Sequence, residues 1–166
     1  MASRYRIVFL LALIMLVLDQ ITKLWVAATL PFWTSKTVIP GFFNLVHVLN
    51  KGAAFGFLND LDAVWRPYFF MAATALAIVL ILHLLRTVPR EDRVLFTALG
   101  LILGGALGNL ADRIRLGEVI DFLDFYIGKY HWPAFNVADI AISVGSVLLL
   151  VSVYRNRRYG GSEDKQ

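Results

Sequence analysis

Residues 94–113 read VLFTALGLILGGALGNLADR, an apolar run that ends in an amide, a carboxylate and a guanidinium. The apolar part, about residues 94–111, is long enough for a helix to cross roughly 30 Å of hydrocarbon. Gly100, Gly104 and Gly108 recur every fourth residue, a spacing that lets a neighbouring helix approach closely in lipid. The run therefore predicts a membrane-spanning helix in close contact with a neighbour, with a polar cluster at one end.

Three further apolar stretches, about residues 7–28, 67–85 and 137–154, also reach or approach the length of a span. The 166-residue chain is 58% hydrophobic and only 17% charged, which leaves no room for a separate soluble domain. We expect an all-α polytopic membrane protein, a single membrane domain of residues 1–166 with four transmembrane helices.

The connections between the spans differ in character. Residues 29–66 place Pro and Gly between β-prone runs such as residues 42–49, which predicts a small extracytoplasmic β-rich segment between the first two helices. Residues 114–135 are expected to form an outer loop, in which Asp124 is expected to be solvated. The charged tail, residues 155–166, is expected to be disordered.

Basic residues are unevenly distributed between the two sides of such a bundle. The side that includes both termini carries more of them than the other. They are Arg4, Arg6, Arg86, Arg90, Arg93, Arg155, Arg157, Arg158 and Lys165. The positive-inside rule makes that side cytoplasmic, so the net charge of +4 reflects topology and not a nucleic-acid partner. The first span also resembles a cleaved signal sequence, but Asp19, Gln20 and Lys23 interrupt it, and we interpret it as a retained helix.

The sequence offers few ligands for a metal or a prosthetic group. It contains no cysteine, so disulfides, thiol catalysis and Cys-ligated metals are excluded. The three histidines, His47, His83 and His131, form no recognisable metal-binding pattern. We therefore expect neither a metal site nor a cofactor.

Four aspartates lie in the spans or at their rims: Asp19, Asp112, Asp121 and Asp139. A carboxylate in hydrocarbon is costly, so acids at membrane depth indicate a functional site. At a rise of about 1.5 Å per residue, Asp139 lies about 5 Å below the outer rim, and the other three also favour the outer half. The economical hypothesis is that they converge on one site, because isolated buried carboxylates would each need a separate partner.

Two carboxylates that share one site do not both ionise easily, so one keeps a proton while the other acts as a base. Such a pair can activate water to attack a peptide carbonyl and can protonate the leaving amine. In one alternative, the acids only cap helices and form salt bridges at the rim. In another, they relay ions in a proton- or ion-coupled transporter, which predicts acids across the full thickness of the membrane. The cytoplasmic half of each span contains none.

Five blocks of the sequence resemble, in order, those of the lipoprotein signal peptidase (signal peptidase II) family of bacterial inner-membrane aspartyl proteases. They are DQITK (19–23), NKGAAFG (50–56), GGALGNLADR (104–113), VIDF (119–122) and FNVAD (135–139). One block alone is a weak signal, whereas five in register on a four-helix frame are specific. The resemblance covers nearly the whole chain.

The resemblance implies a role for each matching residue. Asp121 and Asp139 would be the catalytic dyad. Asp19 and Lys23, one helical turn apart, would be a structural pair whose charges neutralise each other. Five supporting polar residues would line the site: Asn50, Asn109, Asp112, Arg113 and Asn136. Asp124 lies outside the motif and receives no role.

The resemblance also implies an activity. The substrate would be a prolipoprotein whose cysteine already carries a diacylglyceryl group, and cleavage would fall just before that cysteine. The enzyme would be a monomer in the bacterial inner membrane, with cytoplasmic termini, lipid around it and its site toward the outer face. The outer segment, about residues 29–60, would cradle lipid and peptide.

Overall fold

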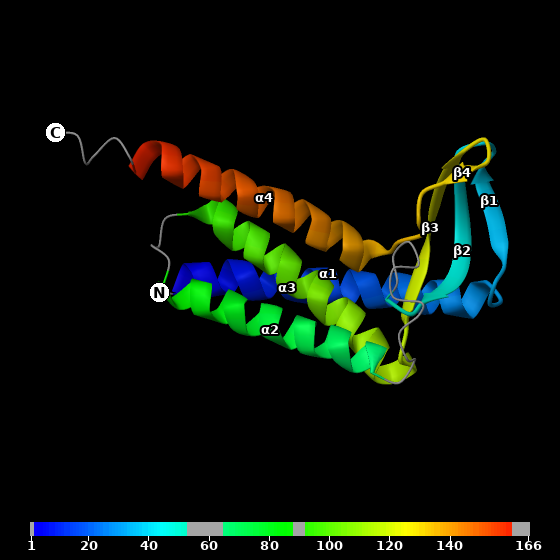
Figure 1. Ribbon diagram of the computed structural model, residues 1–166, viewed down its shortest axis with the longest axis horizontal. Helices are drawn as coiled ribbons and strands as arrows, with labels where there is room; N and C mark the ends of the chain where they lie inside the picture. The colour runs from blue at the N-terminus through cyan, green and yellow to red at the C-terminus, as the bar shows by residue number, and fades with distance from the viewer. Residues whose placement is uncertain (1, 53–64, 88–91, 161–166) are drawn as a thin grey trace.

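The computed structural model describes residues 2–52, 65–87 and 92–160, which contain four long helices. Their bounds are α1 Ala2–Thr29, α2 Arg66–Thr87, α3 Arg93–Leu116 and α4 Val137–Gly160. The helices run lengthwise beside one another, and α1 begins at the same end of the bundle at which α4 finishes (Figure 1). Each helix is long and apolar enough to cross a membrane, which confirms the expected four-helix membrane fold.

Helix α3 lies at the centre of the bundle. Of its most apolar 18-residue window, 56% is buried, compared with 22% in α1, 11% in α2 and 22% in α4. Its glycines explain this position, because a Cβ on Gly104 would lie only 2.7 Å from the carbonyl oxygen of Ala12 in α1. On another side of α3, a Cβ on Gly105 would collide with the carbonyl oxygen of Ala138 in α4. Only glycine lets both neighbours come this close.

Both ends of α3 carry capping groups. Asp92 caps the beginning, where its side chain accepts a hydrogen bond of 2.9 Å from the backbone N–H of Leu95. At the other end, Gly117 adopts a left-handed conformation with φ of 77°, and its N–H donates to the carbonyl of Arg113. This cap ends the helix and turns the chain into the strand that follows.

A four-stranded antiparallel sheet lies at the end of the bundle opposite the start of α1 and the finish of α4 (Figure 1). Its strands, in spatial order, are β1 Ser35–Ile39, β2 Phe43–Asn50, β3 Val119–Ile127 and β4 Tyr130–His131. The β-rich segment between α1 and α2 is thus confirmed for its described part, whereas residues 53–64 lie outside the described residues.

The expectation of an outer loop over residues 114–135 is wrong. The segment contains the nine-residue strand β3, which pairs with β2 so that Phe43 lies opposite Phe125 and Asn50 lies opposite Val119. The partner strand comes from about 70 residues earlier in the chain. This pairing depends on tertiary contact, which a local pattern does not reveal.

The last helix is longer than its apolar pattern indicated. It continues to Gly160, so the tail expected to be disordered from residue 155 is helical over its first part. Arginine is a good helix former, so the arginines after residue 154 end the apolar pattern of the sequence but do not end the helix. Residues 161–166 of the tail lie outside the described residues.

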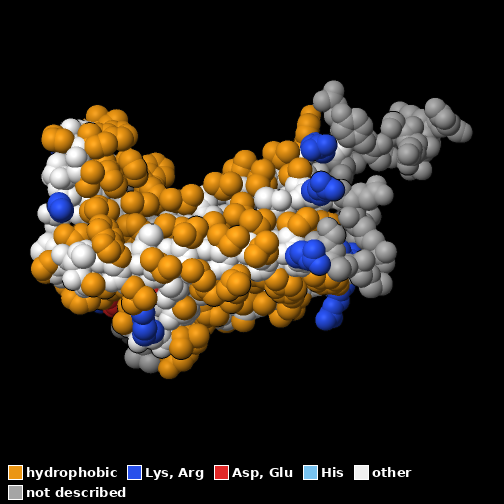
Figure 2. Space-filling model, turned by 180° about the vertical axis from the view of Figure 1, so that it is seen from behind, with side chains coloured by type: hydrophobic (Ala, Val, Ile, Leu, Met, Phe, Trp, Pro, Cys, Tyr) orange, Lys and Arg blue, Asp and Glu red, His pale blue; other side chains and the backbone are white. Residues whose placement is uncertain are grey.

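The surface divides into an apolar belt and a basic end. Hydrophobic side chains cover the middle of the bundle, and Lys and Arg gather at the end opposite the sheet (Figure 2). Exposed side chains in the belt include Leu13, Leu76 and Leu150, each more than half exposed. A surface of this kind suits contact with lipid.

Candidate active site

Asp121 and Asp139 line one cavity of about 840 Å³ between the sheet and the N-terminal end of α4. Asp121 lies on β3 and Asp139 in the first turn of α4. The two elements meet because Phe135, just before α4, forms an antiparallel bridge with Leu123 of β3. The cavity continues down α4 past Ile140 and Val144, so it opens toward the apolar belt.

Asp121 is held between two amides. Asn50 donates to its Oδ2 at 2.9 Å, and Asn136 donates to its Oδ1 at 2.7 Å. The residue is only 2% exposed. Burial, together with the nearby negative charge of Asp139, raises the pKa of Asp121 to about 7, against the smaller lowering effect of the two amides. Asp121 therefore holds a proton more readily than an ordinary aspartate.

The carboxylate of Asp139 accepts hydrogen bonds from two donors. Asn109 donates to its Oδ1 at 2.8 Å, and the backbone N–H of Asn136 donates to its Oδ2 at 3.2 Å. In return, the side-chain oxygen of Asn136 accepts the backbone N–H of Asp139 at 2.9 Å, which completes a reciprocal capping box at the start of α4. The N-terminus of a helix also favours an anion. Asp139 thus lies at a helix N-terminus and accepts two hydrogen bonds there.

Asn136 connects the two carboxylates, since its side-chain amide contacts Asp121 while its backbone contacts Asp139. The same amide lies 3.2 Å from the side-chain oxygen of Asn109. One residue that caps a helix thus sets the relative position of both acids.

A buried ammonium group lies behind the dyad. Nζ of Lys23 is 2.8 Å from Asp19, 2.9 Å from Asp112 and 2.9 Å from the side-chain oxygen of Asn109. The side chains of the lysine and both acids are fully buried. Three partners match the three N–H groups of the ammonium. Lys23 therefore bridges α1 to α3, and Asn109 carries the contact on to Asp139.

Asp19 and Asp112 each hold the backbone immediately before one dyad residue. Asp19 accepts the N–H of Ala138 at 2.9 Å, and Asp112 accepts the N–H of Ile120 at 3.2 Å. The sequence pattern indicated Asp19 and Lys23 as a pair but did not reveal these contacts, because they join residues 8 and 119 positions apart. Both carboxylates thus tie α1 and α3 to the segments that carry the dyad.

Three more site residues complete this picture. The side-chain amide of Gln20, a residue of the block DQITK to which the resemblance gave no role, donates to Asp112 and to the carbonyl of Gly108, each at 3.2 Å. Arg115 pairs with Asp112 at 3.2 Å, so the salt-bridge alternative describes part of the environment of Asp112. Arg113 lies over the ring of Phe70 at 4.8 Å, and its guanidinium donates to the carbonyl of Asn109 at 3.4 Å.

The expectation that Asp124 is solvated is wrong. It is 7% exposed, accepts a hydrogen bond of 2.9 Å from Asn44 and lies 2.8 Å from Nδ1 of His131. Asn44 lies directly opposite Asp124 in the β2–β3 register, so the strand pairing buries the acid. It lies three positions after Asp121, which places the two side chains on opposite faces of a regular strand.

The comparisons with known proteins decide the family. Residues 11–155 match the family model described as signal peptidase (SPase) II. The chain belongs to the signal peptidase II family. This family is a protease family of the aspartic type, and no comparison supports the transporter alternative. The protein is accordingly a multi-pass membrane protease.

Individual relatives cover almost the whole chain. The lipoprotein signal peptidase of Maridesulfovibrio salexigens is 52% identical over 155 residues, which span 93% of this chain and 99% of the relative. That of Nitratidesulfovibrio vulgaris is 55% identical over 155 residues, 93% of each chain. A solved bacterial membrane enzyme has a TM-score of 0.78 at 30% identity, covering 95% of this chain and 90% of its own. A second has a TM-score of 0.76 at 33% identity, covering 87% and 90%.

Proposed function

We propose that this signal peptidase II family member removes the signal peptide from diacylglyceryl-modified bacterial prolipoproteins, cutting just before the lipidated cysteine. The observation that carries the proposal is the pair of carboxylates, Asp121 and Asp139, in one cavity that opens toward the apolar belt. A signal peptide spans the membrane and its lipid anchor lies in the outer leaflet, so the bond to be cut lies near the outer interface. The dyad lies at the corresponding end of α4.

The environments of the two acids support different roles. Asp121, whose pKa is raised to about 7, carries the shared proton at neutral pH. Asp139, which accepts two hydrogen bonds at a helix N-terminus, is the carboxylate. Asp139 takes a proton from water, and the water oxygen bonds to the peptide carbonyl carbon. Asp121 gives its proton to the carbonyl oxygen, which produces a neutral tetrahedral intermediate.

Collapse of the intermediate restores the dyad. The proton on Asp139 passes to the nitrogen of the leaving amine as the carbon–nitrogen bond breaks. A hydroxyl proton of the intermediate returns to Asp121 as the new carboxyl group forms. One water is consumed, one peptide bond is broken, and both acids regain their starting states.

The remaining residues act by position. Asn50, Asn109 and Asn136 orient the dyad through their amides. We assign Asp112 a positioning role through the backbone N–H of Ile120. Asp19 and Lys23 together are the structural pair that this arrangement rests on, and Arg113 supports the site as a nearby positive charge. The rest of the second block, residues 53–56, lies outside the described residues.

We further propose that the protein lies in the bacterial inner membrane with both termini in the cytoplasm. The basic end of the bundle supports this orientation, because it coincides with the start of α1 and the end of α4 (Figure 2). We also propose a monomeric enzyme surrounded by membrane lipid, in keeping with the apolar side chains that cover the middle of the bundle.

Cleavage of a diacylglyceryl-modified precursor, followed by gel mobility, tests the function. We expect the wild-type protein to cleave it, and Asp121→Asn and Asp139→Asn each to lose cleavage by at least about a thousandfold. Asp124→Asn is the matched control, because Asp124 is a buried acid on the same strand as Asp121 and has no role in the chemistry. Full activity in either dyad variant, with the variant folded, would contradict the assignment.

A further inference from the structure

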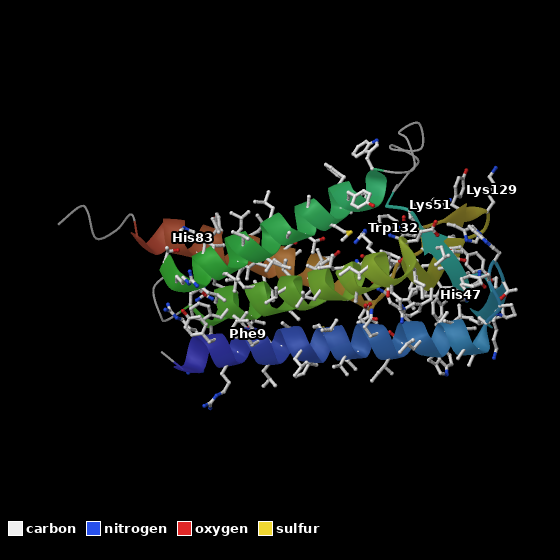
Figure 3. All side chains as sticks on the ribbon, turned by 90° about the horizontal axis from the view of Figure 1, so that it is seen from below. Phe9, His47, Lys51, His83, Lys129 and Trp132 are labelled. Atoms are coloured by element: carbon white, nitrogen blue, oxygen red, sulfur yellow. The ribbon has the colours of Figure 1, made fainter. Side chains whose placement is uncertain are left out.

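Two exposed tryptophans line the cavity that holds the dyad. Trp33 lies between α1 and β1 and Trp132 follows β4, so they come from segments about 100 residues apart. Their side chains are 75% and 66% exposed. Trp132 and Lys51, which both line the cavity, lie toward the sheet end of the bundle, while His83 lies near the opposite end (Figure 3). Two large apolar rings are thus left uncovered beside the reacting groups.

Trp33 is held in a strained backbone conformation. Its φ of +61° is the only positive φ of a non-glycine residue among residues 2–52, 65–87 and 92–160. Such a conformation costs on the order of 1–3 kcal/mol and persists where surrounding contacts enforce it, often at functional sites. The N–H of Trp33 donates to the carbonyl of His47 at 2.9 Å, and the Thr34 hydroxyl donates to the carbonyl of Pro31 at 2.7 Å.

His47 anchors the turn that carries Trp33. It is 1% exposed, and its Nδ1 lies 2.7 Å from the carbonyl of Leu30 at the end of α1. Its ring also packs on Phe32 at 4.2 Å. The contacts fix the backbone of the turn, while the indole itself projects into the cavity. The strained backbone of Trp33 is therefore not compensated by burial of its ring, which stays 75% exposed.

Trp132 has the same combination of a fixed backbone and a free ring. Its N–H donates to the carbonyl of Phe125 at 2.8 Å. Phe135, three residues later, exchanges backbone hydrogen bonds of 2.9 and 3.1 Å with Leu123. On the other side, His131 is paired with Asp124. Both flanks of Trp132 are thus attached to β3, the strand that carries Asp121.

The chemistry of the two rings specifies a class of ligand. An indole offers a wide apolar face and one N–H donor, and tryptophan accumulates where apolar chains meet polar head groups. Within the described part of the chain, neither indole N–H has a hydrogen-bond partner, so both donors are available. The neighbouring walls of the cavity are apolar at Ile140 and Val144. A ligand that combines ester carbonyls with acyl chains matches these groups.

We propose that Trp33 and Trp132 form the site that holds the glyceryl ester region of the substrate's lipid anchor, and so position the peptide bond at the dyad. This inference rests on the proposed function and deepens it. The indole N–H groups donate to the ester carbonyls, and the ring faces cover the first methylenes of the acyl chains. Trp33 and Trp132 are positioning residues, since neither takes part in the proton transfers.

Equilibrium binding of the lipid anchor without its peptide tests the inference. The probe is fluorescently labelled S-(dipalmitoylglyceryl)cysteine amide, and the protein is the full chain with Asp139→Asn in detergent micelles. We expect Trp33→Ala and Trp132→Ala each to raise the Kd about tenfold. Trp33→Phe and Trp132→Phe keep a ring without the N–H and are expected to raise it less. Trp25→Ala is the control, because Trp25 is 54% exposed on α1 and lies outside the cavity.

The two kinetic constants of cleavage provide a second readout in otherwise wild-type protein. Both alanine variants should raise KM for a dipalmitoyl precursor about tenfold and leave kcat unchanged, whereas a merely structural defect lowers kcat and the unfolding temperature. An unchanged Kd in both Phe and Ala variants would overturn the inference. So would a KM increase of equal size for precursors whose cysteine carries a plain S-alkyl chain without glyceryl esters, because it would show that the rings do not recognise the ester region.

Failure of the proposed function has a different signature. In that case the wild-type chain leaves the lipidated precursor intact, whatever residue stands at positions 33 and 132. The binding arm still reports on the rings under that outcome, because it requires no turnover.

Discussion

Lys23 shows how one residue can organise a site that it does not enter. Its ammonium group satisfies two buried carboxylates and one amide oxygen, and each carboxylate also holds the backbone before a dyad residue. A buried ion pair contributes little net stability compared with an apolar replacement, but loss of one partner is costly. Lys23 is therefore required chiefly because Asp19 and Asp112 are present.

Lys23→Met should abolish cleavage and lower the free energy of unfolding by about 3–5 kcal/mol, since two buried carboxylates lose their cation. Thermal unfolding in micelles measures the loss. The double variant Asp19→Asn with Lys23→Met should recover part of the stability, because one of the unpaired charges is gone, while cleavage stays absent. Wild-type stability in the single variant would contradict this account of Lys23.

The pKa of Asp121 predicts how activity depends on pH. Burial and the charge of Asp139 raise this pKa from 3.8 to about 7, and the mechanism uses the protonated form. The value of kcat/KM for cleavage, measured at low substrate concentration, should therefore fall as the pH rises through about 7. A rate that stays constant from pH 6 to pH 9 would contradict the role of Asp121 as the acid.

The same shift has a consequence for stability. Because the folded-state pKa lies above the unfolded value, the folded protein binds more protons between about pH 4 and pH 7. The free energy of unfolding therefore decreases as the pH rises through that window. Asp121→Asn removes this contribution, so its unfolding temperature should depend less on pH than that of the wild type.

At the scale of elements, the close approach of α3 to its neighbours determines where the site can form. Gly104 contacts α1 and Gly105 contacts α4, so one central helix fixes both partners. The same helix delivers Asn109 and Asp112, which contact Asp139 and Lys23. A shift of α3 against α1 would therefore separate the polar groups behind the dyad.

Gly104→Ala should lower the free energy of unfolding by about 1–3 kcal/mol, because the new methyl group would lie 2.7 Å from the Ala12 carbonyl oxygen and force the helices apart. Cleavage should decrease with it. Ile114→Ala, on the same helix at a side chain 67% exposed, is the control and should change stability little. Equal stability of Gly104→Ala and wild type would show that α1 and α3 tolerate a wider separation.

The sheet depends on a long-range strand pairing that a local sequence pattern does not reveal. Val119–Ile127 has strand-forming composition, yet its role depends on pairing with Phe43–Asn50. That pairing brings Asn50 to Asp121 and Asn44 to Asp124. It therefore accounts for the contact between Asn50 and Asp121, and for the burial of Asp124, which was expected to be solvated.

At the scale of the whole molecule, charge separates the two ends. The basic end includes the start of α1 and the end of α4, while the dyad lies beside the sheet at the other end (Figure 2). An asymmetry of this kind determines the orientation in which a membrane protein is inserted. The natural absence of cysteine makes the orientation simple to measure.

Single cysteines should report opposite sides of the membrane. Lys129→Cys, in the exposed turn after β3, should react with a membrane-impermeant maleimide in intact cells whose outer membrane has been permeabilised. Arg155→Cys, near the end of α4, should react only after the inner membrane is also opened. The reverse pattern would contradict the proposed topology. Cleavage by each variant checks that the protein remains folded.

The sequence by itself determined the four spans, the β-rich segment after the first of them and the identity of the candidate dyad. These properties depend on local length, composition and short motifs, because the cost of exposing polar groups to lipid acts on each segment separately. The glycine spacing in α3 also indicated a close helix contact before any partner was known.

Only the tertiary structure distinguishes the environments of the four aspartates. Asp19 and Asp112 contact Lys23 and the backbone, whereas Asp121 and Asp139 face the cavity, and nothing in the four residues themselves distinguishes these environments. The protonation of an acid and the direction of a hydrogen bond depend on which distant groups surround it. For the same reason, the two uncovered tryptophans became a candidate lipid site only when folding brought Trp33 and Trp132 to one cavity.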